Sequence, residues 1–380
     1  MPTAPVNSEG VVLYYDDTGA PESSTTYVTI VLVHGTAIHS GIFKPLKPYA
    51  VQNNVRLVLL NLRDYSGSTA YSSDELEAIR SPSHESQAAV LQARALELVA
   101  FLSWFVKHEK IPPIAKVSES PTVTGGIALL GWSGGNYQTL PVLSHADKVA
   151  EDTKLLLDSY FRSLIHQEKP PSAIVFPDVV YDAALYAIGA SPPEGLYNPL
   201  RDQSLTVAER VATFPLWVST YYPQVENLST DLSSLVSTLK VRQTSTAADR
   251  DTFVPTIQTM SARDLDEIVD LKVMNRSQLA IMSMHPIVYA ENFRRALCYA
   301  EERSKEQEIV WSALKVQVVW CDMSHGDAVA TAQMIRDEYE QYHRTGQKAR
   351  PLQLFQLQKA NHFAHWDQPE SFVQFLASIV

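Results

Sequence analysis

The chain has 380 residues, of which 45% are hydrophobic and 19% are charged, and its formal net charge is −11. This composition is that of an ordinary globular protein and excludes a disordered or fibrous chain. The negative charge is spread along the chain without a basic cluster, which argues against a nucleic-acid partner. The length predicts either two or three domains or one α/β core with a large insertion.

The two cysteines, Cys298 and Cys321, are far apart and lack a C-x-x-C spacing. They predict neither a disulfide framework nor a zinc site, and they favour a reducing compartment. The segment from Met1 to Pro5 lacks the basic and apolar pattern of a secretion signal, and no stretch holds 18 consecutive apolar residues. We therefore expect a cytoplasmic protein without a membrane span.

Strand and helix signals alternate through the first half of the chain. The opening strands are separated by a turn signal, which predicts an antiparallel start. The run 55–60 is almost continuously Val and Leu, as in a strand buried on both faces of a parallel sheet. Parallel strands need helical crossovers, and apolar residues recur at steps of three and four over about 85–107. The predicted elements are strands at 11–15, 27–33, 55–60, 127–130 and 173–176 and a helix at about 85–107.

This rhythm breaks down between about Tyr181 and Trp311, where polar helices alternate with turns rich in Pro and Tyr, and 242–251 is predicted to be a mobile loop. Regular order then returns. The pattern predicts an α/β fold with a mostly parallel sheet flanked by helices, divided into a core (1–181), an inserted segment (182–311) and the rest of the core (312–380). The last predicted elements are strands at 316–320 and 352–356 and helices at about 328–342 and 370–379.

The pentapeptide Gly131-Trp132-Ser133-Gly134-Gly135 satisfies G-x-S-x-G directly after a buried strand and before a predicted helix. A serine on so sharp a turn has strained dihedral angles, and its neighbours must be small because the backbone passes closely. The turn exposes the hydroxyl at the end of the strand, and the next helix directs positive potential at it. Ser133 is therefore the predicted nucleophile.

His362 follows the last predicted strand, and the carboxyl ends of parallel strands converge on one rim. It is the predicted general base, while the nearby His365 is expected to pack behind the site. A tetrahedral intermediate also needs backbone donors, for which the amides of Thr36 and Gly134 are the candidates. His34, which ends the strand before Thr36, is expected to be structural.

Three aspartates compete for the role of the acid that orients the base. Asp322 and Asp327 both follow the strand 316–320, but Ser324 and Asp327 have the spacing of a capping box, which gives Asp327 a structural reason. Asp178 follows the predicted strand 173–176 and would reach the same rim. Asp322 is the preferred candidate, with Asp178 and Asp327 as alternatives.

Four segments carry a resemblance to a known family: Val33 to Thr36, Asn61 to Gly67, Gly131 to Gly135 and Asn361 to Glu370. They resemble the successive signatures of the α/β-hydrolase superfamily, and the order Ser, Asp, His along the chain is that of its triad. The resemblance covers about two-thirds of the chain and implies an α/β-hydrolase fold.

The chain also departs from the family pattern. Asn61 and Asp64 replace an acid and a glycine of the usual loop, and Ser324 stands where the common spacing would place aspartate. The inserted segment 182–311 has no matching motif and resembles a cap domain. Its apolar residues are candidates for the pocket wall or for the cap's own core: Phe214, Trp217, Tyr221, Tyr222, Met282, Met284 and His285.

The resemblance implies a serine hydrolase that cleaves an ester or lactone of a medium-sized, largely apolar small molecule through an acyl-enzyme. This chemistry needs no metal and no organic cofactor, so neither is expected. The same triad could instead cleave carbon-carbon bonds or transfer an acyl group. A noncatalytic ligand-binding protein of the same fold is the alternative of another class.

Overall fold

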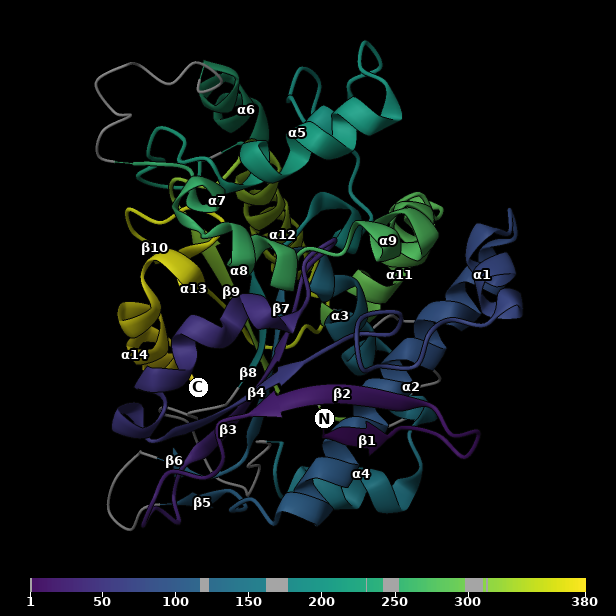
Figure 1. The fold of residues 1–380 in the computed structure, drawn as a ribbon, viewed down its shortest axis with the longest axis vertical. Helices are drawn as coiled ribbons and strands as arrows, with labels where there is room; N and C mark the ends of the chain where they lie inside the picture. The colour runs from purple at the N-terminus through teal and green to yellow at the C-terminus, as the bar shows by residue number, and fades with distance from the viewer. Residues whose placement is uncertain are drawn as a thin grey trace.

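In the computed structural model, residues 2–116, 123–161, 177–229, 231–241, 253–297, 310–311 and 314–380 are described. Their centre is an eight-stranded sheet in the order β1-β2-β4-β3-β7-β8-β9-β10 (Figure 1). The strands are β1 (Thr3–Pro5), β2 (Val12–Asp17), β3 (Val28–Val33), β4 (Val55–Leu60), β7 (Ile127–Trp132), β8 (Pro177–Tyr181), β9 (Lys315–Cys321) and β10 (Leu352–Leu357), and β5 (Ala115–Lys116) and β6 (Val123–Thr124) form a separate pair.

The antiparallel start is confirmed, because β2 pairs antiparallel with both β1 and β4. From β4 to β10 every neighbouring pair in the sheet is parallel. The register aligns the carboxyl ends of the central strands: Val33 lies opposite Gly131, and Trp132 lies opposite Tyr181. Residues that directly follow β3, β7 and β8 therefore meet at one rim.

Each face of the sheet is covered by its own apolar core, because alternate side chains of a strand point to opposite faces. In β3, Val31 and Val33 pack with residues of α2 and α12, whereas Ile30 and Leu32 pack with residues of α14. The helices of the core are α1 (Ser73–Arg80), α2 (His84–Glu109), α3 (Asn136–Ser144), α4 (Glu151–Asp158), α12 (Gly326–Arg344), α13 (Ala364–Asp367) and α14 (Pro369–Ile379), with the 3-10 helix η1 (Ser40–Tyr49).

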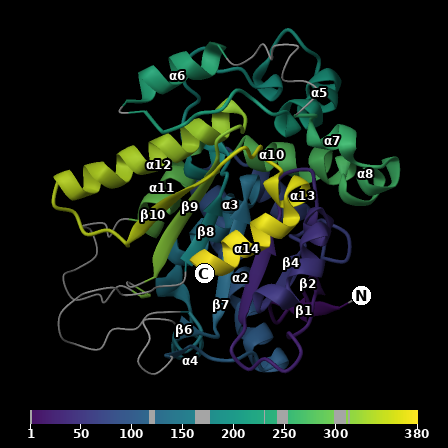
Figure 2. The ribbon, with the colours of Figure 1, turned by 90° about the vertical axis from the view of Figure 1, so that its left-hand side faces the viewer.

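The described residues between β8 and β9 are mostly helical, and the helices α5 to α8 lie beyond one end of the sheet (Figure 2). Its last helix, α11, packs against α3 and α2 and so belongs to the helical layer on the sheet. The boundaries at 182 and 311 stay a prediction. The helices are α5 (Val207–Ser219), α6 (Leu232–Val241), α7 (Thr256–Thr259), α8 (Ala262–Ile268), α9 (Leu271–Val273), α10 (Leu279–Met282) and α11 (Pro286–Leu297), with a π-helical turn at Met274–Gln278.

The predicted fold class, a mostly parallel sheet flanked by helices, is confirmed. The predicted strand 173–176, the predicted loop 242–251 and Cys298 lie outside the described residues. Helix α2 is the single described helix that is long and apolar enough to cross a membrane by length and composition alone. Its apolar window is 67% buried inside the protein, as in a core helix.

Candidate active site

Ser133 stands on a strained turn between β7 and α3. Its φ of 54° lies in the left-handed region that a side chain other than glycine rarely adopts. The turn is crowded: a Cβ at Gly35 would come within 2.9 Å of the Ser133 Cβ, and one at Gly135 within 2.8 Å of the Val33 carbonyl oxygen. Asn136 closes the turn, because its amide nitrogen donates to the Ser133 carbonyl at 2.9 Å. Gly135 of the motif is thus required by close approach of the backbone, and Gly35 is required by its contact with Ser133.

His362 follows β10 and is held on both sides. Its Nδ1 lies 2.6 Å from Oδ2 of Asp182, and both side chains are buried. The indole nitrogen of Trp132 donates to the carbonyl oxygen of His362 at 3.0 Å, so the residue before Ser133 holds the backbone of the histidine. In a neutral imidazole whose Nδ1 donates to a carboxylate, the other ring nitrogen, Nε2, can accept a proton.

Asp182 directly follows β8 and has its own support from the end of β9. Its Oδ1 accepts a hydrogen bond from the Cys321 amide at 3.1 Å, and its Oδ2 accepts one from the Ser324 hydroxyl at 2.6 Å. Its φ of 42° is again left-handed. Ser324, at the position where the family pattern has an aspartate, thus serves the carboxylate of the neighbouring strand.

The preference for Asp322 as the partner of His362 is therefore corrected, because Asp182 occupies the Nδ1 side of the ring. The Asp322 carboxylate instead accepts hydrogen bonds from the Ala360 amide at 3.1 Å and from the Gln224 side chain at 2.6 Å. It ties the loop that leads to His362 to the end of β9. Asp322 thus has a structural role. The sequence pattern alone does not distinguish this role from that of a catalytic acid.

The two alternative acids are also wrong as partners of His362. Asp178 lies inside β8, near the end away from the rim, and it is buried with neither carboxylate oxygen bonded to another described residue. Asp327 forms an ion pair with Arg201 at 2.7 Å and accepts a hydrogen bond from Asn198 at 2.7 Å. The capping box expected for Asp327 is absent from α12, whose N-cap is His325.

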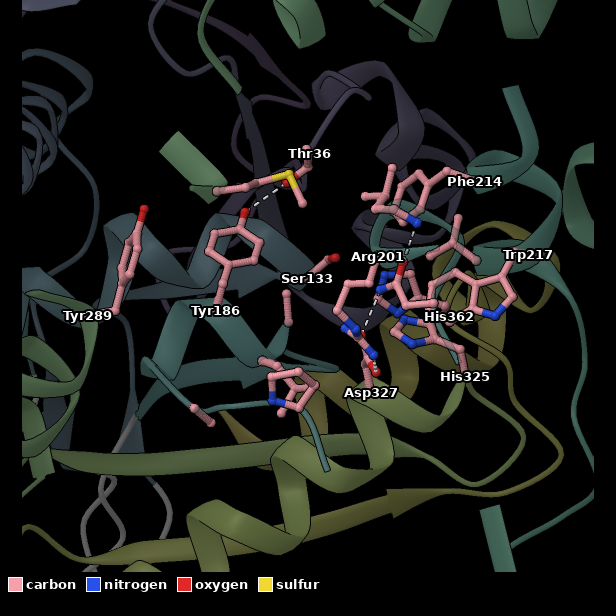
Figure 3. A pocket seen from close by; sticks show the side chains of 18 of the residues that line it. Thr36, Ser133, Tyr186, Arg201, Phe214, Trp217, Tyr289, His325, Asp327 and His362 are labelled. Atoms are coloured by element: carbon pink, nitrogen blue, oxygen red, sulfur yellow. Dashed lines mark hydrogen bonds and ion pairs between the residues drawn. The ribbon is translucent and has the colours of Figure 1, made fainter. Parts of the chain in front are cut away.

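Ser133 and His362 line the same cavity, which has a volume of about 270 Å³ (Figure 3). Ser133 is partly exposed to it, while His362 is 1% exposed. Within the described residues no hydrogen bond joins the Ser133 hydroxyl to His362. In unliganded enzymes such bonds are often long and tighten only when substrate is bound.

The histidines around His362 are uncharged. His325 packs against the His362 ring at a centroid distance of 4.7 Å, and His365 lies behind it against Trp132 at 4.5 Å. Burial, with the nearby His362, holds the pKa of both His325 and His365 well below the usual range. His34 is buried, its Nε2 accepts the Leu62 amide proton, and burial lowers its pKa to about 3. His34 is thus structural, as expected.

The two residues predicted to supply the oxyanion donors lie close together beside the turn. A Cβ at Gly134 would lie 3.3 Å from the backbone nitrogen of Thr36. Among the described residues, the Thr36 amide has no hydrogen-bond acceptor, and Gly134 lies in the first turn after the strand, where amides have no partner inside the helix. Their role as oxyanion donors stays a prediction.

Apolar side chains form most of the cavity wall. Four of the cap residues named from the sequence line it, whereas Tyr221 and Tyr222 line a separate cavity and His285 is exposed and packs on His84. Asp327 was expected only as a candidate acid, and no sequence motif marks the other polar members of the wall. The wall includes Phe214, Trp217, Met282, Met284, Tyr289 and Phe363, with the polar side chains of Tyr186, Asn198, Arg201, His325 and Asp327.

No protein-family model matches the chain, and no curated protein matches it. Solved structures of similar shape are 10–15% identical in sequence. Est816, described as an N-acyl homoserine lactone degrading enzyme, is 15% identical with a TM-score of 0.49, over 100% of both chains. A laboratory-evolved variant of potato epoxide hydrolase StEH1 is 11% identical with a TM-score of 0.48, over 99% of this chain and 98% of that one. A lipase-esterase related protein from Clostridium acetobutylicum is 11% identical with a TM-score of 0.46, over 97% of this chain and 99% of that one.

The order and direction of the strands identify the fold. Two antiparallel strands stand at one edge of the sheet, six parallel strands follow, and the serine elbow comes after β7. A carboxylate after β8 and a histidine after β10 lie at the same rim, in the chain order Ser, Asp, His. By its strand order and the turn that carries Ser133, the chain has the α/β-hydrolase fold.

Proposed function

We propose that this protein is a serine hydrolase that cleaves an ester or lactone of a medium-sized, largely apolar small molecule. The observation that carries the proposal is the 2.6 Å contact between His362 Nδ1 and Asp182, in a histidine that lines the same cavity as the strained Ser133. A buried carboxylate on Nδ1 gives the imidazole the tautomer that a general base needs.

The first half of the reaction forms an acyl-enzyme. His362 Nε2 takes the proton of the Ser133 hydroxyl while the serine oxygen attacks the substrate carbonyl. The amides of Thr36 and Gly134 donate to the oxyanion of the tetrahedral intermediate, and the protonated imidazole then passes its proton to the leaving alcohol. Asp182 stabilises the positive ring throughout. Water repeats these steps on the acyl-enzyme and releases the acid.

The cavity supports the choice of substrate. Its volume of about 270 Å³ and its wall of Phe, Trp, Met and Tyr side chains suit an apolar molecule of modest size. The charged side chains on the wall, Arg201 and Asp327, already neutralise each other. A medium-sized neutral ester or lactone therefore fits better than a charged one. A cytoplasmic location stays a prediction.

The test is a panel of p-nitrophenyl esters and lactones of graded chain length, assayed with the wild type and with Ser133→Ala. We expect hydrolysis of medium chains, with turnover falling for charged and for very large substrates, and no activity in the variant. Product analysis by mass spectrometry separates the alternatives, since a cleaved carbon-carbon bond or an acyl group on a non-water acceptor gives a different product mass. Binding of these compounds without any turnover would indicate the noncatalytic role.

A further inference from the structure

Two hydroxyl groups stand directly beside the predicted oxyanion hole. The side-chain oxygen of Thr36 lies 2.8 Å from the phenolic oxygen of Tyr186, and both residues line the cavity (Figure 3). We call these two groups the hydroxyl pair. A Cβ at Gly134 would collide with both oxygens. The second glycine of the elbow therefore leaves room for the hydroxyl pair against the backbone that follows the nucleophile.

The hydroxyl pair has one proton more than its own hydrogen bond needs. Each group carries one O–H, and the bond between the two oxygens uses one of these protons. Neither oxygen has another hydrogen-bond partner among the residues that the structure describes. Burial raises the pKa of Tyr186, so the phenol stays protonated at neutral pH. One O–H donor is thus free beside the Gly134 backbone.

The position of Tyr186 is fixed by the nucleophile and by other aromatic rings. The Ala184 amide donates to the carbonyl oxygen of Ser133 at 3.3 Å, which ties the segment after Asp182 to the elbow. The Tyr186 ring packs against Tyr289 at a centroid distance of 5.7 Å and against Tyr137 at 6.2 Å. A donor held by rigid packing needs little reorganisation when charge develops, which is the property that makes oxyanion donors effective.

We propose that Tyr186 is a catalytic residue, whose phenolic O–H donates a third hydrogen bond to the oxyanion formed on Ser133. In this arrangement the Thr36 hydroxyl donates to the phenolic oxygen, and the phenol, the more acidic of the two groups, directs its own proton into the hole. The hole then has two backbone donors and one side-chain donor. This inference rests on the proposed acyl-enzyme chemistry, and it assigns a role to a residue that no sequence motif marks.

The test compares Tyr186→Phe with Thr36→Val on the best ester of the panel. Tyr186→Phe keeps the ring and its packing, and we expect kcat to fall roughly ten- to a hundredfold with little change in KM, somewhat below the usual loss for one backbone donor. Thr36→Val keeps the backbone amide and leaves the phenol free to donate, so its kcat should fall less than Tyr186→Phe does. An unchanged kcat in Tyr186→Phe, or a larger loss in Thr36→Val, would overturn the assignment.

A transition-state analogue gives a second readout that a structural role would not move. An alkyl trifluoromethyl ketone adds to the serine and places the same oxyanion in the hole, so its affinity should fall in Tyr186→Phe by about the same factor as kcat/KM. Tyr137→Phe is the matched control, because Tyr137 is a buried neighbour of Tyr186 outside the cavity wall. Its kcat should stay within about twofold of the wild type.

The experiment also separates this inference from the proposed function. A wild type that hydrolyses no ester of the panel and forms no adduct with the ketone would overturn both. An active wild type whose rate and inhibitor affinity survive in Tyr186→Phe would overturn the inference alone. In every variant, labelling of Ser133 by a fluorophosphonate confirms that the protein being compared is folded and carries the nucleophile.

Discussion

His362 Nδ1 and Asp182 Oδ2 lie 2.6 Å apart, although 180 residues separate them in the chain. The strand order explains the contact. Asp182 directly follows β8, which lies between β7 with its serine turn and β9, while His362 follows β10 at the edge of the same sheet. The loop after β10 returns over β9 and brings the imidazole to the carboxylate. His362 lines the cavity of the proposed reaction, and Asp182 is buried away from the cavity wall.

Asp182→Asn should lower kcat/KM by roughly a thousand- to ten-thousandfold, because an amide at this position favours the wrong histidine tautomer. The matched variant is Asp322→Asn, since Asp322 is buried at the end of the next strand but bonds to the Ala360 amide and to Gln224. We expect Asp322→Asn to lower the melting temperature and to reduce kcat/KM less than Asp182→Asn does. Steady-state kinetics and thermal unfolding of both variants check this, and a larger loss of rate in Asp322→Asn would reverse the assignment.

Ser324→Ala removes the hydroxyl that donates to Asp182 at 2.6 Å from a buried site. A hydrogen bond to a charged group contributes about 1.5–3 kcal/mol, and losing this one frees Asp182 to move away from His362. We expect kcat to fall about tenfold or more. Ser324→Thr, which restores the hydroxyl, should recover most of the rate. Equal rates in wild type and Ser324→Ala would show that the bond has no part in orienting the base.

Gly134→Ala should abolish most activity without unfolding the protein. The added methyl group would collide with the side-chain oxygens of Thr36 and Tyr186 and displace donors from the oxyanion hole, where one donor is worth about a hundred- to a thousandfold in rate. Gly346→Ala is the control, because this exposed glycine has a φ of +71° and no atom near its missing Cβ. Gly346→Ala should keep the wild-type rate, although its positive φ strains the added side chain and lowers the melting temperature. An active Gly134→Ala would contradict the placement of the donors.

Asp178 should make stability depend on pH. Burial raises the pKa of this carboxyl from 3.8 to about 7, so the native state keeps a proton that the unfolded chain loses near pH 4. Its stabilising contribution is complete below about pH 4 and is lost as the pH rises to about 7, an effect on the order of 4 kcal/mol at most.

Asp178→Asn removes this titration. The free energy of unfolding of the variant, relative to the wild type, should therefore be higher at pH 8 than at pH 5. Urea unfolding of both proteins at the two pH values measures the difference. A difference that is the same at both pH values would show that the carboxyl is not held protonated in the folded state.

The sheet and the elbow follow from local signals in the sequence. The run 55–60 appears as β4 with the same bounds, and the helix expected at about 85–107 is α2. Strand and helix patterns of apolar residues involve residues close together in the sequence, so they can be recognised without knowledge of the fold. The glycines around Ser133 mark the turn for the same reason, since close approach excludes larger side chains.

The acid and the polar wall of the cavity depend on contacts between distant segments. Strand β8 is described at 177–181, beyond the predicted 173–176, so the rim position belongs to Asp182 and Asp178 lies inside the strand. The apolar run Val179 to Tyr181 ending in Asp182 was the available signal. Tyr186 has no such signal, because its place beside Gly134 depends on how the loop after β8 folds back over the elbow.

The central claim is that Ser133 is a nucleophile activated by His362. The most direct measurement is intact-protein mass spectrometry after incubation with a fluorophosphonate, followed by mapping of the modified peptide. The account predicts one added group, on Ser133, in the wild type, none in Ser133→Ala, and labelling slowed by orders of magnitude in His362→Ala. A folded wild type that takes no label, or one labelled at another serine while Ser133→Ala reacts equally fast, would contradict it.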